Sequence, residues 1–407
     1  MKLRPWLSIC SATTHLETPT PPSPSKLLML SDTASNNISD TTTTTSYSNH
    51  SCQKPSPETL TLSLKPLPPS HVNFLAVHNH LLYAATGNLI HVIDVTSFAL
   101  LTTVNVAGSS SGSVKSVTFN NGNIFTAHQD KKIRVWKLSE NKQHKHIATL
   151  PTFEDRLIRS VLPKNYINVR RHRKKLWIEH HDAVSGLALV TDQLMCSVSW
   201  DKYLKIWRTS DFRCVESIKA HDDAINAVVA AADGTIYTAS ADRRIKVWAK
   251  PLRKYELVAT LDKHKSAVNA LAVNDNGSLL FSGSCDRSIF VWGKEHGSNR
   301  TLLTATLRGH SKAILCLINV SDLLFSGSAD QTVRIWQREE DGNFCCLKVL
   351  DGYKRPIRSL VVDLDETTFG FEPRSTIRVF SDIGDGVIRM LLIKDLNYQN
   401  FISTHVP

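Results

Sequence analysis

Short runs in which apolar and polar residues alternate recur at a fixed spacing through the middle of the chain. Three segments, His221–Trp248, His264–Trp292 and His310–Trp336, align nearly residue for residue. Each holds two alternating runs, a turn and a third run that ends in Trp, which predicts antiparallel strands with one face against a neighbouring sheet. The tryptophans at 207, 248, 292 and 336 are 41, 44 and 44 residues apart. This period predicts four-stranded propeller blades that stack radially into a ring.

Weaker copies of the pattern extend the repeat on both sides, and together they predict an all-β, seven-bladed propeller. The further blades are expected at His71–Val106, Val114–Leu150, His180–Ile218 and Ile357–Leu392. The first and last copies depart from the pattern, with Ile93 and Leu391 at the Trp position, as terminal repeats often do. Blade two has Asp130 and Trp136 but no His before its first strand. The alternatives are six or eight blades.

The ends of the chain differ in composition from the repeats. Residues 1–57 are rich in Ser, Thr, Pro and Asn, and such a segment cannot bury enough apolar surface to offset its ordering entropy. We expect a disordered tail over 1–57, a propeller over 58–395 and a C-terminal tail over 396–407. Leu60, Leu62 and Leu64 alternate with polar residues, which predicts a strand that supplies the outer strand of the last blade. A secretory signal or an organellar transit peptide is the alternative for the first residues.

Three polar residues recur in the strong copies: a His before the first strand, an Asp six residues before the Trp, and a Ser two residues before that Asp. These segments strongly resemble the WD-repeat family, in which His, Asp, a strand hydroxyl and the Trp ring nitrogen form one hydrogen-bonded chain. The resemblance implies four structural tetrads: His180, Ser199, Asp201 and Trp207; His221, Ser240, Asp242 and Trp248; His264, Ser284, Asp286 and Trp292; His310, Ser328, Asp330 and Trp336. A buried polar chain is tolerated only when every member has a partner, so these residues are interpreted as structural rather than catalytic or metal-binding.

One junction between blades is much longer than the others. Three positions separate Leu261 from the next His, whereas 30 separate Leu150 from His180. The extra segment, residues 151–178, is called the basic insertion because it carries eight Lys or Arg against two acids. Its net charge of +6 is more than half of the formal +11 of the whole chain.

The first half of the basic insertion has helical spacing. Leu157, Ile158, Val161 and Leu162 recur at that spacing after two acidic residues, and Pro163 ends the run. We therefore expect a short amphipathic helix followed by a basic strand or arm.

The string RRHRKK in the second half has three interpretations. It matches a nuclear import signal in composition; it could contact phosphates of nucleic acid or anionic lipid; or it is a solvated or acid-paired segment. Its basic residues are Arg170, Arg171, Arg173, Lys174 and Lys175. Nucleic-acid modules usually interleave exposed aromatic residues with basic ones, and only Tyr166 and Trp177 flank this string. The nucleic-acid interpretation is therefore second to nuclear import.

The WD-repeat resemblance also implies that the His loops and the Asp turns lie on one face of the ring, here called the tetrad face. The basic insertion replaces a loop of the first kind, so we expect it on the same face. Trp200, directly before Asp201, is a candidate partner anchor, with packing beneath the inserted loop as the alternative. The remaining candidates on this face are Asp182, Asp222, Asp223, Lys265, Lys312, Lys354 and Arg355. Their division into an acidic and a basic lobe favours a protein or peptide partner over nucleic acid.

A narrower resemblance rests on the string VRRHRKKLWIEHHDAVSGLAL, on SWDKYLKIW and on the Ser/Thr-rich leader. These are similar to the plant WD-repeat family named after JINGUBANG. That resemblance implies a non-enzymatic regulatory scaffold, with transcription factors among the partner classes, in plant developmental signalling.

Other functional classes find little support in the sequence. No paired carboxylates outside the turns, nucleophile motif, phosphate-binding loop or metal-ligand spacing occurs, so we expect no enzyme activity, metal or cofactor. The eight Cys are scattered without a C-x-x-C pair, and no apolar run approaches the length of a membrane helix. Substrate receptors of cullin ubiquitin ligases usually carry an acid after the blade-ending Trp, and this chain does not.

We therefore expect a monomeric propeller that binds regulatory proteins in the nucleus and cytoplasm. A nucleic-acid-associated assembly factor is the first alternative, and a cullin substrate receptor is the second.

Overall fold

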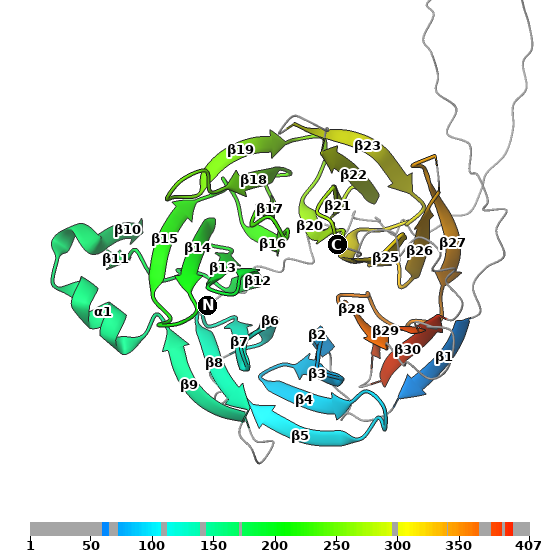
Figure 1. The fold of residues 1–407 in the computed structure, drawn as a ribbon, viewed down its shortest axis with the longest axis horizontal. Coiled ribbons are helices and arrows are strands. Elements are labelled where there is room, and N and C mark those ends of the chain that lie inside the picture. The colour runs from blue at the N-terminus through cyan, green and yellow to red at the C-terminus, as the bar shows by residue number, and fades with distance from the viewer. Residues whose placement is uncertain are drawn as a thin grey trace, which may run out of the picture. The chain divides into compact units, whose positions relative to one another are not determined.

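The computed structural model describes residues 59–64, 72–106, 112–138, 144–170, 173–294, 300–339, 341–365, 376–384 and 387–393. The described strands form seven four-stranded antiparallel sheets arranged as the blades of a ring, which confirms the predicted seven-bladed propeller (Figure 1). The tails expected over 1–57 and 396–407 lie outside the described residues, as do Arg171 and Asp385.

The first three blades hold strands β2–β9 and β12–β15. Blade one consists of β2 (Val72–His78), β3 (Leu81–Thr86), β4 (Leu89–Asp94) and β5 (Leu100–Asn105). Blade two consists of β6 (Val114–Asn120), β7 (Asn123–His128), β8 (Ile133–Leu138) and β9 (His144–Leu150). Blade three consists of β12 (Val184–Thr191), β13 (Leu194–Ser199), β14 (Tyr203–Arg208) and β15 (Cys214–Lys219).

The next three blades are the strong sequence copies. Blade four consists of β16 (Ile225–Ala230), β17 (Ile236–Ser240), β18 (Ile245–Ala249) and β19 (Glu256–Leu261). Blade five consists of β20 (Val268–Val273), β21 (Leu279–Ser284), β22 (Ser288–Lys294) and β23 (Thr301–Arg308). Blade six consists of β24 (Ile314–Val320), β25 (Leu323–Ser328), β26 (Val333–Arg338) and β27 (Phe344–Leu350).

The seventh blade joins the two ends of the folded region. Its sheet has the order β1-β30-β29-β28, from β1 (Thr59–Leu64), β28 (Leu360–Asp365), β29 (Thr376–Gly384) and β30 (Val387–Ile393). Strand β1 pairs antiparallel with β30 from Thr59 opposite Ile393 to Leu64 opposite Ile388. This confirms that the first strand of the sequence is the outer strand of the last blade.

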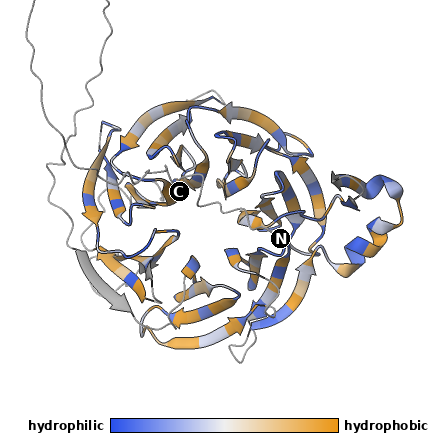
Figure 2. Ribbon diagram, turned by 180° about the vertical axis from the view of Figure 1, so that it is seen from behind, coloured by the Kyte–Doolittle hydropathy of each residue, from blue (hydrophilic) through white to orange (hydrophobic). Residues whose placement is uncertain are grey.

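The blades are held together by apolar clusters that lie between neighbouring sheets. Figure 2 shows where hydrophobic positions lie along the strands. Consecutive positions are buried in the second strands, such as β21 and β25, so both faces of these sheets are packed. The Trp in the third strand of a blade packs against the preceding blade. Trp248 joins a cluster with Val198 and Ile206 of blade three, and Trp336 joins one with Phe281 of blade five. A blade therefore completes its core only when its neighbour is present.

Hydrogen bonds from the inner strands also link adjacent blades. Ser185 Oγ donates to the Ile225 carbonyl (2.6 Å), Asn226 Nδ2 to the Val268 carbonyl (2.9 Å), and Asn269 Nδ2 to the Ile314 carbonyl (2.9 Å). Similar bonds join blades two and three, where Ser116 Oγ accepts from the Leu187 N–H, and blades seven and one, where Ser359 Oγ accepts from the Leu75 N–H. Small polar side chains at these inner positions thus tie successive blades to one another.

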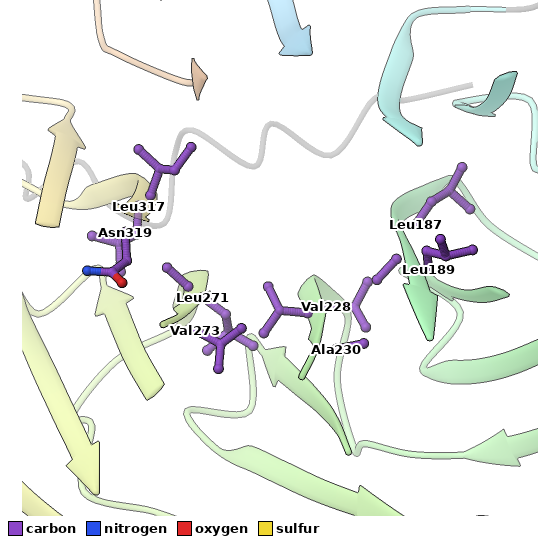
Figure 3. A pocket seen from close by; sticks show the side chains of 12 residues that line it. Leu187, Leu189, Val228, Ala230, Leu271, Val273, Leu317 and Asn319 are labelled. Atoms are coloured by element: carbon purple, nitrogen blue, oxygen red, sulfur yellow. The ribbon is translucent and has the colours of Figure 1, made fainter. Parts of the chain in front are cut away.

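The inner strands of four blades line an open cavity of about 320 Å³ near the axis of the ring (Figure 3). It is lined by Leu187–Leu189, Val228–Ala230, Leu271–Val273 and Leu317–Asn319. Asn319 is the polar side chain in this lining, and no lining residue is titratable. This cavity offers no acid, base or nucleophile for catalysis.

Candidate functional site

Four hydrogen-bonded tetrads fasten the loops of the tetrad face to the strands beneath them. In blades three to six, the His Nδ1 lies 2.8–2.9 Å from the Asp Oδ2, and the His Nε2 lies 2.8 Å from a strand hydroxyl. The Trp Nε1–H donates to the same hydroxyl at 2.8–3.0 Å. These bonds confirm the predicted His, Asp and Trp members of each tetrad.

The predicted hydroxyl members were wrong by two residues. The structure uses Ser197, Thr238, Ser282 and Ser326 in place of Ser199, Ser240, Ser284 and Ser328. In blade three, Ser197 lies opposite Lys205, two residues from Trp207, so it is a diagonal neighbour of the Trp on the same face of the sheet. Ser199 lies about 7 Å farther along the strand, too far for the Trp ring nitrogen to reach.

The serines that we predicted have a different local role. Ser199 Oγ donates to the Asp182 carbonyl (3.0 Å) and accepts from the Asp201 N–H (3.1 Å). The equivalent bonds recur in blade four, where Ser240 Oγ also donates to the Ala224 carbonyl (2.9 Å). This second set of serines closes the turn that carries the tetrad Asp.

The environment of the buried His180 favours its neutral form. Burial lowers the pKa of this imidazole, although the nearby Asp201 carboxylate opposes the shift. With one ring proton, Nδ1–H donates to Asp201 and Nε2 accepts the Ser197 hydroxyl proton, while the Ser197 oxygen accepts from the Trp207 N–H. Every member of the chain then has a partner, which is the condition for a stable buried polar network.

The tetrad carboxylates remain ionised in the folded chain. Burial alone would raise the pKa of Asp242, but the hydrogen bond and charge of His221 and two backbone N–H groups outweigh it and lower the pKa to about 2. Asp201 is similar: burial opposes ionisation, and His180 lowers its pKa to about 2. Since these carboxylates bond to loop N–H groups as well, they are committed to structure.

These pKa values predict loss of stability in acid. The ordinary Asp value is 3.8, so between about pH 4 and 2 the unfolded chain takes up protons that folded Asp201 and Asp242 resist, and stability falls with pH. The lowered pKa of His180 adds a loss that starts below its ordinary value of 6.5. We expect the melting temperature to decline below about pH 6.5 and to decline more steeply between about pH 4 and 2, where both carboxylates contribute as well. An Asp242→Asn variant, which lacks one titrating group, should show a shallower acid limb in the same thermal melts; an equally steep limb would contradict this assignment.

The weaker blades replace the tetrad with other residues. In blade two, which lacks the loop His, His128 from β7 lies 2.8 Å from the Thr126 hydroxyl, which also accepts from the Trp136 ring N–H (3.0 Å). In blade seven, the Tyr353 hydroxyl lies 2.9 Å from Ser381 Oγ. Sequence reasoning missed both substitutes because the first comes from a strand and the second is not a His.

Basic and acidic side chains surround the tetrads on the tetrad face. Lys265, Lys312 and Lys354 are exposed, as are Asp182, Asp222 and Asp223, so the predicted candidates of this face are accessible apart from the half-buried Arg355. The sequence analysis missed further basic residues on this face. They directly follow the Asp of the tight turn in blades two to five and have a positive φ. This set includes Lys131 (φ 76°), Lys202 (φ 78°), Arg243 (φ 74°) and Arg287 (φ 71°).

The additional bases weaken the predicted division into two lobes. In the expected acidic lobe, Arg244 Nη1 lies 3.3 Å from Asp222 Oδ2, and Lys202 Nζ donates to the Asp222 carbonyl. The tetrad face therefore carries positive charge around more of the ring than the sequence indicated.

Trp200 lies on the tetrad face beside the inner strand of the neighbouring blade. Its ring is half-buried, and the Lys115 Nζ lies 5.7 Å from the ring centroid. Burial lowers the pKa of Lys115, and the nearby positive charge of Arg358 on blade seven lowers it further. An aromatic ring and two cations from three blades thus meet at the inner edge of this face.

Comparison with protein-family models gives four matches to "WD domain, G-beta repeat", at residues 173–208, 212–249, 255–293 and 302–337. The chain contains WD40 repeats. Its fold is a seven-bladed WD40 propeller, a fold that is typically a non-catalytic scaffold for protein interactions. A search of the curated proteins found none that matches this chain. No helix within the described ranges is long and apolar enough to cross a membrane, and no metal-binding group of three or more His, Cys, Asp or Glu occurs in that part of the chain.

The basic insertion projects from the rim of the WD40 propeller. It folds into α1 (Phe153–Ser160), the 3₁₀ turn η2 (Pro163–Asn165) and a hairpin of β10 (Tyr166–Arg170) and β11 (Arg173–Leu176). The helix and the basic strand confirm the expected local structure. The expected location was wrong: α1 and the hairpin lie outside the ring beside β15, the outer strand of blade three (Figure 1).

Specific contacts explain this position. Arg159 Nη2 donates to the Cys214 carbonyl of β15 (3.0 Å), and the Arg159 guanidinium lies 4.5 Å from the Trp177 ring centroid. Cys214 pairs with Trp207, at the end of the blade away from the Asp201 turn. The insertion therefore leaves the tetrad face and follows the outer wall of the blade, which loop length alone did not predict.

A buried lysine anchors the end of the insertion to the WD40 propeller. Lys205 is 0% exposed, and its Nζ donates to the Trp177 carbonyl and to Ser217 Oγ (2.6 Å). Blade four, which has no insertion, uses Lys246 in the same way, with Nζ bonded to the Ala220 carbonyl (2.6 Å).

We expect Lys205→Ala to release the insertion as well as to destabilise the blade. Loss of two buried hydrogen bonds should cost about 2 kcal/mol, and hydrogen exchange should rise in residues 173–178. The control Lys246→Ala should lower stability by a similar or smaller amount without that local increase. If hydrogen exchange in residues 173–178 is the same in both variants, Lys205 does not anchor the insertion.

Proposed function

We propose that this protein is a non-enzymatic scaffold that binds acidic segments of regulatory proteins on its tetrad face. The observation that carries the proposal is a set of Lys and Arg side chains in the loops and turns that the buried tetrads hold in place. They are exposed at Lys265, Lys312, Lys354, Arg243 and Arg287 and half-buried at Lys131 and Lys202. Preformed loops lose little entropy on binding, and a charged rim favours an oppositely charged partner. Trp200, beside Lys115, supplies an aromatic anchor near the inner edge of this surface.

The identity of the partners follows from the resemblance described above. Similarity to the JINGUBANG-related family supports regulatory partners, with transcription factors among them, in plant developmental signalling. It also supports a chain that works in both nucleus and cytoplasm, with the basic residues around Lys174 as the import signal. A monomeric propeller with its tetrad face free is the form that this proposal requires.

A nucleic-acid-associated assembly factor is the second candidate, because the basic hairpin is the most positively charged segment of the chain. The two aromatic residues beside it are already engaged: Trp177 packs against the Arg159 guanidinium, and the Tyr166 hydroxyl donates to the Ser160 carbonyl (3.2 Å). Bases would have to displace these contacts in order to stack. This observation favours a protein partner.

The test compares proteins recovered by affinity purification, after nuclease treatment, with three forms of the chain. These are the wild type, Trp200→Ala, and a variant with Lys265, Lys312 and Lys354 changed to Glu. We expect a set of nuclease-resistant partners that is retained by the wild type and reduced in both variants. A fourth form, with Arg170, Arg171, Arg173, Lys174 and Lys175 changed to Ala, should lose nuclear abundance but keep these partners.

Two results would contradict the proposal. If the partners are lost on nuclease treatment, and the nucleic acid recovered without nuclease falls steeply with salt, the second candidate is correct. If both tetrad-face variants retain every partner, the scaffold uses another surface.

A further inference from the structure

Helix α1 of the basic insertion has the opposite orientation to an ordinary surface helix. Asp155, 3% exposed, and Arg159 face the propeller, where Arg159 Nε bonds to Asp155 Oδ1 (2.7 Å) and the guanidinium reaches β15. These two residues are one turn apart, so they mark one side of the helix. A surface helix of a globular protein normally turns its apolar stripe toward the core. Here that side is charged.

The apolar side chains of the helix point away from the propeller. Phe153, Leu157 and Val161 recur every four residues and are 78%, 57% and 75% exposed. Ile158 (60%) is also exposed, as is Leu162 (47%), which is extended and follows the helix. Figure 2 shows this insertion as a projecting unit whose helix contains both hydrophobic and hydrophilic positions. Contiguous exposed apolar side chains on a soluble domain mark an interaction surface rather than a solvated one.

The fold stabilises this arrangement rather than merely tolerating it. The Thr152 side chain caps the helix by accepting from the Asp155 N–H (3.2 Å), and Asn165 Nδ2 donates to the Arg159 carbonyl (2.8 Å) near its end. Arg156 Nε lies 3.0 Å from Glu179 Oε1, which ties the helix to the chain just before His180. The exposed apolar residues are thus presented by a helix fixed at both ends.

The charge around these apolar residues identifies the kind of partner. Arg159 pairs with Asp155, and Arg156 and Lys175 share Glu179. Lys164 and Lys174 are exposed, and neither forms an ion pair with another described residue. A second copy of this surface would bring two segments of net charge +6 together, which like-charge repulsion opposes. Residues 1–58 contain four Lys or Arg and four acids, so this segment has no net negative charge to offer.

We propose that the outer face of α1, together with Lys164 and Lys174, binds an amphipathic helix of an acidic partner protein. The partner's apolar stripe would cover Phe153, Leu157, Ile158 and Val161, and carboxylates on its flanks would meet the two lysines. The inference rests on the proposed scaffold function and adds a second contact surface, independent of the tetrad face.

The test uses the full chain and a fluorescent synthetic peptide with Leu at helical positions i, i+3, i+4 and i+7 and Glu on both flanks. Fluorescence anisotropy should show saturable binding to the wild type. Leu157→Asp with Ile158→Asp should weaken it by at least about tenfold. Lys164→Glu with Lys174→Glu should also weaken it and reduce its salt dependence. Leu252→Asp, at an apolar residue 88% exposed elsewhere on the ring, is the matched control and should bind as the wild type does.

Several outcomes would overturn the inference. A peptide with Lys in place of Glu that binds equally well would exclude charge complementarity. Binding to phosphatidylcholine–phosphatidylserine vesicles without binding to the peptide would assign the face to a membrane, and a concentration-dependent dimer abolished by Leu157→Asp would assign it to a second copy. Hydrogen-exchange protection of α1 that disappears when residues 1–58 are deleted would assign it to the leader. Trp200→Ala should leave peptide binding unchanged, so failure here is separable from failure of the tetrad-face proposal.

Discussion

Deletion of residues 59–64 should destabilise the whole propeller rather than the seventh blade alone. Six residue pairs join β1 to β30, and each backbone hydrogen bond contributes about 1 kcal/mol net, so we expect a loss on the order of 5 kcal/mol. The deletion also exposes the edge of β30, which can then pair with another chain. Thermal and denaturant melts should show one transition moved to lower temperature and lower denaturant concentration, with increased aggregation.

A peptide with the sequence of residues 56–66 provides the control for this deletion. Added in excess, it should restore part of the lost stability because it can occupy the vacant edge of the seventh blade. A scrambled peptide should have no effect. Unchanged melting of the deleted chain would show that β1 does not close the ring.

Replacement of Thr238 by Ala should cost about 3 kcal/mol, more than replacement of the nearby Ser240. The Thr238 hydroxyl contacts both His221 Nε2 (2.8 Å) and the Trp248 ring N–H (3.0 Å), and without it two buried polar groups lose their partner. Ser240→Ala removes the hydrogen bonds that the Ser240 hydroxyl makes to the backbone of the turn. The carbonyl and N–H groups of this turn lie nearer to water, so the variant should lose about 1 kcal/mol of unfolding free energy. Chemical denaturation, with the free energy of unfolding taken from the midpoint and slope, measures the difference.

Thr238→Ser separates the hydroxyl from the methyl group. The other three tetrads use Ser at this place, so this variant keeps the hydrogen bonds and should lose about 1 kcal/mol from the methyl group alone. If Thr238→Ser is as damaging as Thr238→Ala, packing rather than the tetrad determines the effect.

The fold could be predicted from the sequence because the residue pattern that determines it is periodic. The regular spacing of Trp207, Trp248, Trp292 and Trp336 predicts blades, and alternation at Leu60, Leu62 and Leu64 predicts the strand that closes them. Both features are local patterns that reflect which side of a strand is buried. The seven blades and the closing strand are both present in the structure.

The errors arose where local patterns do not determine geometry. Ser197 and Ser199 are both buried serines on the same side of β13, and only the pairing of β13 with β14 decides which one reaches Trp207. Helical spacing in the basic insertion predicts an amphipathic helix, but not that Asp155 and Arg159 form the inner side of α1. That orientation depends on contacts with β15, which is more than fifty residues away in the sequence.

The basic residues of the tight turns show a third limit of prediction from sequence. Lys131, Lys202, Arg243 and Arg287 are ordinary charged residues in the sequence, and their common place on the tetrad face follows from the tight turns after the Asp positions. Repeat alignment would have found them if the residue after each Asp had been compared across blades. The substitution of a loop His by His128, in contrast, has no such signal because it comes from a different strand.

The pairing of β1 with β30 has a consequence for synthesis of the chain. Strand β1 is completed by β30, which is made more than 300 residues later, so the ring stays open while the intervening six blades are made. A chain terminated before residue 387 would lack β30, which would leave β1 without its partner and remove Ile388 and Met390 from the core shared with blade one. Termination between β29 and β30 should therefore yield an aggregation-prone open ring rather than a six-bladed scaffold, and a cell could recognise such products by their unpaired strand edges.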